Sequence, residues 1–349
     1  MQSLTKRRIP VLPVVLVLII LALVSVVFSL GFGSEQIPLD EIIKVLRGRL
    51  AGESVDSPVD TIIWDLRMPR ALLALTAGAG LSIAGAGMQT MVRNPLADPY
   101  LLGISAGASV GATAVITMGL LSQFGVYALS VGALLGALGS AVAVYLVAQA
   151  QGGLTPLRMV LAGVVMSAAF SSIASFMVFL SDDNRAANSV MFWMLGSVAG
   201  ATWERLILPV IVVVIVSVGM LALSGWLDAL AAGPETAAAL GIRVNSLRNG
   251  LFVALGILVG VIVAVSGGIG FVGLIVPHAA RMIVGALHRR MLLVTAFGGA
   301  IFLLWVDVLS RVIARPQEIP LGVVTGVIGA PIFLMLMGRT QYAFGGRDR

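Results

Sequence analysis

The chain has 349 residues, of which 59% are hydrophobic and only 11% are charged. A soluble domain carries about 25% charged residues, so this composition excludes an ordinary cytosolic enzyme, a disordered protein and a disulfide-stapled secreted domain. Lipid must solvate the chain, and we expect a single all-α transmembrane domain over residues 1–349. The formal charge of +6 is typical of anchoring at a membrane surface and does not indicate nucleic-acid binding.

Apolar stretches long enough to cross about 30 Å of hydrocarbon define ten expected spans. The first runs from Ile9 to Gly31. It is longer than the apolar core of a signal peptide, about 7–15 residues, so we interpret it as a retained anchor. The other nine are expected at 69–92, 100–121, 124–148, 158–180, 206–226, 249–267, 270–286, 291–313 and 320–338.

Two shorter helices are expected between the spans. Apolar residues at helical spacing predict a surface helix over Ile37–Leu50. Val190–Ala201 is too short to cross a bilayer, so we interpret it as an interfacial or re-entrant helix.

The distribution of charge predicts the orientation. An even number of spans places both termini on one side. If that side is the cytoplasm, the inside segments contain 13 of the 22 basic residues and 4 of the 16 acidic residues. Because Lys and Arg are enriched on the cytoplasmic side, this count favours a multi-pass protein of the cytoplasmic membrane with both termini inside.

The chain lacks the residues that ATP hydrolysis would need. A phosphate-binding loop requires Gly-x-x-x-x-Gly-Lys-Ser/Thr, and neither of the two lysines, Lys6 and Lys44, lies in such a sequence. Any ATPase would therefore be a separate chain. The absence of cysteine and the presence of only two histidines predict no metal site and no cofactor in this chain.

Two other mechanisms are considered, an intramembrane hydrolase and an ion-driven secondary transporter. The segment 103–107, with Ser105 at its centre, matches the nucleophile elbow of hydrolases, which requires a strand, a turn and a helix. Inside a span, Gly103, Gly107 and Gly111 lie on one helix face instead, which favours close helix packing. His278, beside Pro277, is the one histidine well inside a span, and we interpret it as a hydrogen-bonded residue at a helix end.

An ion-driven secondary transporter would bury ionisable residues in mid-span. The expected spans contain few of them, although Asp307 and Arg311 are four residues apart and could pair on one helix face. This scarcity counts against a relay of charges and favours an energy source outside the chain.

Several motifs become specific in combination. They are Asp65-Leu66-Arg67-Met68-Pro69-Arg70, Asn94-Pro95-Leu96-Ala97-Asp98-Pro99, Pro277-His278-Ala279-Ala280-Arg281 and Glu318-Ile319-Pro320-Leu321-Gly322. With them, nearly the whole chain resembles the FecCD-type permease subunits of binding-protein-dependent ABC importers.

The resemblance implies a permease that catalyses no covalent reaction and imports an iron chelate, such as a ferric siderophore or haem. Cobalamin, another metal chelate or an oxyanion is the alternative cargo. The resemblance also implies a homodimer or a close heterodimer of permeases, an ATPase dimer that binds ATP and Mg²⁺ on the cytoplasmic side, and a substrate-binding protein that docks outside.

The inside segment 226–248 is the expected coupling loop. Pro234 and Glu235 suit the first turn of a helix and Gly241 suits its end, so the local chemistry predicts a short helix over 234–240. The resemblance implies that this helix contacts the ATPase, and the alternative is a solvated loop. The residues implied in the contact are Pro234, Glu235, Thr236, Ala237, Leu240, Gly241 and Arg243.

Three arginines are implied in docking the binding protein. They are Arg67, Arg70 and Arg311, and bidentate pairing with carboxylates of the partner would orient it. The alternative is that these arginines pair with Asp65 and Asp307 or extend to the membrane interface.

The resemblance places a cytoplasmic gate at the loop after the second expected span and at the start of the fifth. Asn94 precedes a proline, which biases its backbone away from the helix and suits the end of a span. The implied gate residues are Asn94, Leu96, Pro156 and Leu157.

Overall fold

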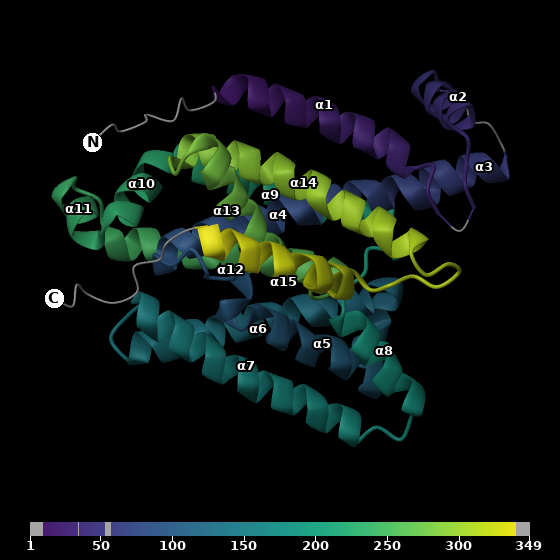
Figure 1. Cartoon of the computed structure of the whole chain (residues 1–349). Coiled ribbons are helices and arrows are strands. Elements are labelled where there is room, and N and C mark those ends of the chain that lie inside the picture. Colours follow the sequence, from purple (N-terminus) through teal and green to yellow (C-terminus); the bar gives the residue numbers. More distant parts are fainter. Residues whose placement is uncertain (1–9, 34, 53–56, 340–349) are drawn as a thin grey trace.

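The computed structural model describes residues 10–33, 35–52 and 57–339, which form an all-helical bundle (Figure 1). Its longer helices are α1 (Val11–Ser29), α4 (Met68–Val92), α6 (Ala128–Ala150), α7 (Pro156–Phe179), α9 (Trp203–Ala222), α12 (Val244–Ser266), α14 (His288–Val312) and α15 (Leu321–Arg339). Its shorter helices are α2 (Leu39–Leu50), α3 (Pro58–Thr61), α5 (Ile104–Met118), α8 (Asn184–Met194), α10 (Ser224–Ala232), α11 (Pro234–Ala239) and α13 (Val272–Val284). A π-helical segment, η1 (Ile62–Arg67), and two 3₁₀ segments, η2 (Pro99–Leu102) and η3 (Ser122–Tyr127), complete these elements.

The expectation of a polytopic helical membrane protein is confirmed. Among the described residues, 7 helical segments are long and apolar enough to cross a bilayer. The shorter apolar helices α5, α13 and α15 lie where three more spans were expected. The count of ten is not reached by length alone, because the 13 residues of α13 rise only about 20 Å.

The second span begins earlier than expected. The helix runs continuously from Pro58 to Val92, although the predicted start was residue 69. Pro69 lacks an N–H and would disrupt a regular helix, and the π-helical segment η1 ends only two residues before it. A π turn changes the hydrogen-bond pairing locally, so the helix continues past the proline.

The third span is interrupted near its start. Gly103 has a left-handed backbone with φ 73, which separates η2 from α5. The predicted helix over 100–121 is therefore a 3₁₀ turn followed by a helix that ends at Met118.

The short helix between the fifth and sixth spans lies earlier than predicted. It covers Asn184–Met194 because the Asp183 side chain caps its first turn and Gly196, with φ 77, turns the chain after it. The loop that follows is not helical, yet its backbone is hydrogen-bonded: Ser197 N–H donates to Ser266 O, and Leu321 N–H donates to Gly196 O. Such pairing is required of irregular backbone at membrane depth.

Small residues allow α4 to lie at the centre of the bundle. It packs against α9, α12, α13 and α14. A Cβ atom added at Gly78 would overlap the backbone of Gly299 on α14, and one added at Gly85 would overlap Gly273 on α13. Close backbone approach of this kind is how helices associate in lipid.

The two ends of the bundle differ. Figure 1 shows α10 and α11 beyond one end, where the first turn of α1 also lies, and α2, α3 and α8 at the other. We call these the α11 end and the α2 end. The expected positions of the chain termini concern residues 1–9 and 340–349, which are outside the described residues.

Candidate functional site

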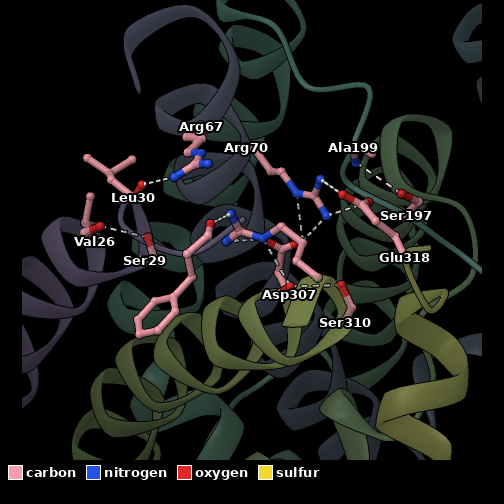
Figure 2. Close-up of polar contacts among 12 residues, drawn as sticks. Val26, Ser29, Leu30, Arg67, Arg70, Ser197, Ala199, Asp307, Ser310 and Glu318 are labelled. Atoms are coloured by element: carbon pink, nitrogen blue, oxygen red, sulfur yellow. Dashed lines mark hydrogen bonds and ion pairs between the residues drawn. The ribbon is translucent and has the colours of Figure 1, made fainter. Parts of the chain in front are cut away.

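The α2 end contains a buried network of arginines and carboxylates (Figure 2). Arg70, only 9% exposed, donates from Nε to Asp307 Oδ1 at 2.9 Å. Its other two nitrogens donate to Glu318 at 2.8 and 2.9 Å, a bidentate pair. Asp307 is fully buried and also forms an ion pair with Arg311 at 2.9 Å. One carboxylate therefore holds two arginines from different helices.

The remaining donors of this network bind backbone carbonyls. Arg67 donates to Leu30 O at 2.6 Å and to Glu35 O at 2.8 Å. Arg311 donates to Phe32 O at 2.8 Å. These bonds attach the segment between α1 and α2 to the residue before α4 and to the last turn of α14.

All three arginines predicted to dock a partner are thus buried and paired within the chain. The alternative of pairing with Asp307 is correct for Arg70 and Arg311, whereas Arg67 binds backbone oxygens and not Asp65. The docking role stays a prediction. The sequence analysis did not identify Glu318 as the partner of Arg70, and the two lie 248 residues apart in the chain.

The predicted coupling helix is present at the α11 end as Pro234–Ala239. Its Ala237 is buried against the bundle, while Glu235 and Thr236 are exposed and Leu240 is 68% exposed. Gly233, with φ 144, turns the chain between α10 and α11. The short helix α11 therefore packs one face against the bundle and exposes the other face.

Sequence reasoning missed a network that connects this segment to the spans. His288 begins α14, and its Nδ1 lies 2.6 Å from Asp228 Oδ1 on α10. The same Asp228 oxygen accepts the backbone N–H of His288 at 2.9 Å, which caps α14. On the other side of the ring, His288 Nε2 lies 2.7 Å from Thr90 Oγ1 on α4. Three helices therefore meet at one buried imidazole.

The gate residues lie in two loops. Asn94 is exposed and its Oδ1 accepts the N–H of Leu96 at 2.9 Å, which forms a tight turn after α4. Pro156 is the first residue of α7, and Leu157 after it is 68% exposed. The side chains of the two loops make no hydrogen bond with each other among the described residues, and their gating role stays a prediction.

The turn after α4 continues into a polar contact with a second irregular segment. Asp98 Oδ1 accepts the N–H of Tyr100 at 2.8 Å and caps η2. The Tyr100 hydroxyl donates to Ile269 O at 3.1 Å and accepts Ile269 N–H at 2.9 Å. Burial raises the pKa of Asp98 to about 6.

Ser105 has the surroundings of a packing site. It lies in the first turn of α5, and no strand occurs among the described residues, so the strand that a nucleophile elbow needs is missing there. A Cβ atom at Gly107 or Gly111 would overlap the backbone of α6. His278 differs from expectation, because it lies in the middle of α13 and its buried Nε2 has no hydrogen-bond partner among the described residues.

The sequence is similar to those of known permease proteins over nearly the whole chain. The molybdate import system permease protein MolB of Haemophilus influenzae is 34% identical over 320 residues, which cover 92% of this chain and 94% of that protein. The Fe(3+)-citrate import system permease protein YfmD of Bacillus subtilis is 37% identical over 326 residues, covering 92% and 94%.

A solved structure and a family model also match nearly the whole chain. A solved structure assigned to the metal-chelate type of ABC transporter, in an inward-facing conformation, superposes with a TM-score of 0.82 at 33% identity, over 94% of this chain and 99% of that one. A family model described as the FecCD transport family matches residues 19–339. The chain therefore belongs to the FecCD transport family.

Proposed function

We propose that this chain is the membrane-spanning permease subunit of an ABC importer and that its cargo is an iron chelate. One observation carries the proposal: a lipid-embedded bundle without a phosphate-binding loop presents an exposed short helix, α11. This helix directly follows α10, which a hydrogen-bond network joins to α4 and α14. Such a helix is suited to receive movement from a separate ATPase, because its anchored face transmits the displacement to the spans.

The proposal orients the bundle with the α11 end in the cytoplasm of the inner membrane. The exposed face of α11, with Glu235 and Thr236, and the exposed Leu240 just after the helix suit a groove on an ATPase dimer. ATP and Mg²⁺ would bind to that partner, and the permease itself would need no cofactor. A change between inward-open and outward-open states would follow ATP binding and hydrolysis.

The α2 end would then face a substrate-binding protein outside. Arg70 is bound by Glu318, whose side chain is 43% exposed at the surface of the bundle. A carboxylate of the partner can replace Glu318 on Arg70 without exposing Asp307, because Asp307 binds the other side of the guanidinium. The buried arginines thus act in docking by exchange of a partner.

A second copy of the chain would complete the passage. The most apolar window of α7 is only 22% buried, so most of that helix is free to contact lipid or another subunit. A homodimer with its pathway between the two copies fits this exposed helix.

The proposed cargo is argued from what two of the similar proteins import. The import of iron citrate by YfmD favours an iron chelate, whereas the molybdate transport of MolB favours an oxyanion as the second candidate. The test is uptake into proteoliposomes that contain the permease together with its partner ATPase and substrate-binding protein. Labelled ferric siderophore, haem and molybdate would be compared, with and without ATP.

We expect ATP-dependent uptake of a ferric chelate, no ATP hydrolysis by the permease alone, and no effect of an ionophore. Uptake that follows an ion gradient in the absence of ATP would refute the proposed class, and uptake of molybdate alone would replace the proposed cargo. A Ser105→Ala variant should retain transport, since the packing role of that segment requires only a small residue.

A further inference from the structure

An elongated groove lies on the surface of the bundle at the α11 end, between α9, α10 and α12. Its volume is about 580 Å³, within the range of roughly 300–1,000 Å³ that is typical of small-molecule sites. The floor is formed by Met220, Leu247 and Leu251, which are all buried. The rim residues Ile215 and Trp226 are at least half exposed. The groove is therefore open at the side of the bundle and apolar inside.

The groove has the length of one lipid leaflet. Along α12 it extends from Arg243, just before the helix, to Ala254, a rise of about 17 Å. The hydrocarbon core of a bilayer is about 30 Å thick, so the groove reaches from one interface to the middle of the membrane. A cytosolic protein could contact only its Arg243 end, whereas an acyl chain can occupy the whole length.

The positive charge of Arg243 at one end of the groove favours an anionic headgroup. The side chain of Arg243 is exposed and forms no hydrogen bond or ion pair among the described residues, and the described lining contains no Asp or Glu. Ser246 adds a hydroxyl in the first turn of α12, and Trp226 also lines the groove. A Lys or Arg near the cytoplasmic surface attracts anionic lipids, and Trp is enriched at membrane interfaces.

We propose that this groove binds one anionic phospholipid, with an acyl chain along α9 and α12 and its phosphate at Arg243 and Ser246. The lipid would lie directly beside the coupling helix, because Gly241 and Arg243 follow α11 in the chain and also line the groove. Lipid binding is measured on the permease alone, without cargo or ATPase, so this proposal and the proposed function can fail separately.

Native mass spectrometry of the delipidated permease in detergent would test the site. The protein would be titrated with phosphatidylglycerol and with phosphatidylcholine of the same acyl chains. The wild type should bind phosphatidylglycerol more tightly. Arg243→Ala should lower that preference about fivefold, the effect of removing one cation near a lipid headgroup, and should leave phosphatidylcholine binding unchanged.

Glycines provide matched controls for the apolar part. Gly219 and Gly250 line the groove, and a Cβ atom at either position meets nothing within 4 Å. Gly219→Leu and Gly250→Leu should therefore fold while they fill the groove and displace both lipids. Gly139→Leu on α6 also enters open space but lies outside this lining, so it should bind lipid like the wild type.

The proposal is overturned if Gly250→Leu and the wild type retain lipid equally, or if Arg243→Ala keeps the full preference for phosphatidylglycerol. It is also overturned if Arg243→Ala loses ATPase association but not lipid selectivity, because the arginine would then belong to the protein interface.

Discussion

At the scale of single residues, Asp307 is the most constrained charge in the described part of the molecule. It is fully buried and pairs with both Arg70 and Arg311. Asp307→Asn would remove the buried negative charge that Arg70 and Arg311 share, and removing one partner of a buried ion pair costs about 3–5 kcal/mol. We expect a large fall in the thermal unfolding midpoint of the detergent-solubilised protein.

Glu318→Gln is the matched control, since it alters the exposed partner of the same arginine. An exposed ion pair contributes only about 0–1 kcal/mol, so this variant should unfold near the wild-type temperature. Equal destabilisation by the two substitutions would contradict the division of this network into a buried and an exposed half.

Asp98 predicts a dependence of stability on pH. Burial raises its pKa from 3.8 to about 6 in the folded protein, so the native state binds the proton more tightly than the unfolded state. This contribution to stability is complete below the unfolded pKa and is lost as the pH rises through about 6. Stability should therefore fall between about pH 4 and pH 6.

Asp98→Asn isolates this effect, because the amide oxygen can still accept the N–H of Tyr100 and cap η2. The variant should lose part of the decrease in unfolding temperature between these two pH values. An identical pH profile in both proteins would show that another group titrates.

At the scale of elements, the proposed function requires movement of α11 to reach the spans through the contact between α10, α4 and α14. Asp228→Ala removes both bonds to His288, whereas Asp228→Asn keeps an oxygen that can accept them. We expect Asp228→Ala to lower the amount of cargo imported per ATP hydrolysed about tenfold, as the loss of charge-assisted hydrogen bonds worth about 1.4 kcal/mol would do.

The ratio of uptake to hydrolysis, measured in proteoliposomes, separates coupling from damage to the fold. A misfolded fraction would lower both rates in proportion and leave the ratio unchanged. Asp228→Asn should restore most of the ratio, and an unaltered ratio in Asp228→Ala would exclude a coupling role.

At the scale of the whole molecule, the exchange of Glu318 for a partner carboxylate predicts how docking responds to mutation. Glu318→Gln weakens the internal competitor for Arg70 and should increase the affinity of the binding protein about fivefold. Arg315→Glu places an acidic side chain on the exposed surface near Arg67 and should decrease the affinity. Surface plasmon resonance on the permease in nanodiscs would measure both.

Unchanged affinity in both variants would assign the arginine network to stability alone. Reversal of Arg67 or Arg70 is a poor test, because both side chains are buried and a carboxylate in their place would disturb the fold before it affected docking.

Local sequence was sufficient for several elements. The α11 helix was predicted within one residue, because proline at its start, glutamate in its first turn and glycine after its end act within a single turn. The spans near 124–148 and 158–180 were also placed within a few residues of α6 and α7, since long apolar runs define them. In contrast, η1 was missed, because no simple residue pattern marks a π turn. The position of α8 was also missed, although the Asp183 cap and Gly196 after the helix are local signals.

The sequence by itself determined the solvent of this protein, its helical class and its family, because apolar content, helix punctuation and short motifs are properties of neighbouring residues. Only the tertiary structure decided which charges are satisfied inside the bundle. Arg70 meets Glu318 and His288 meets Asp228 across distances along the chain of 248 and 60 residues. Such pairings follow from the packing of helices around α4, and no local pattern in the sequence encodes them.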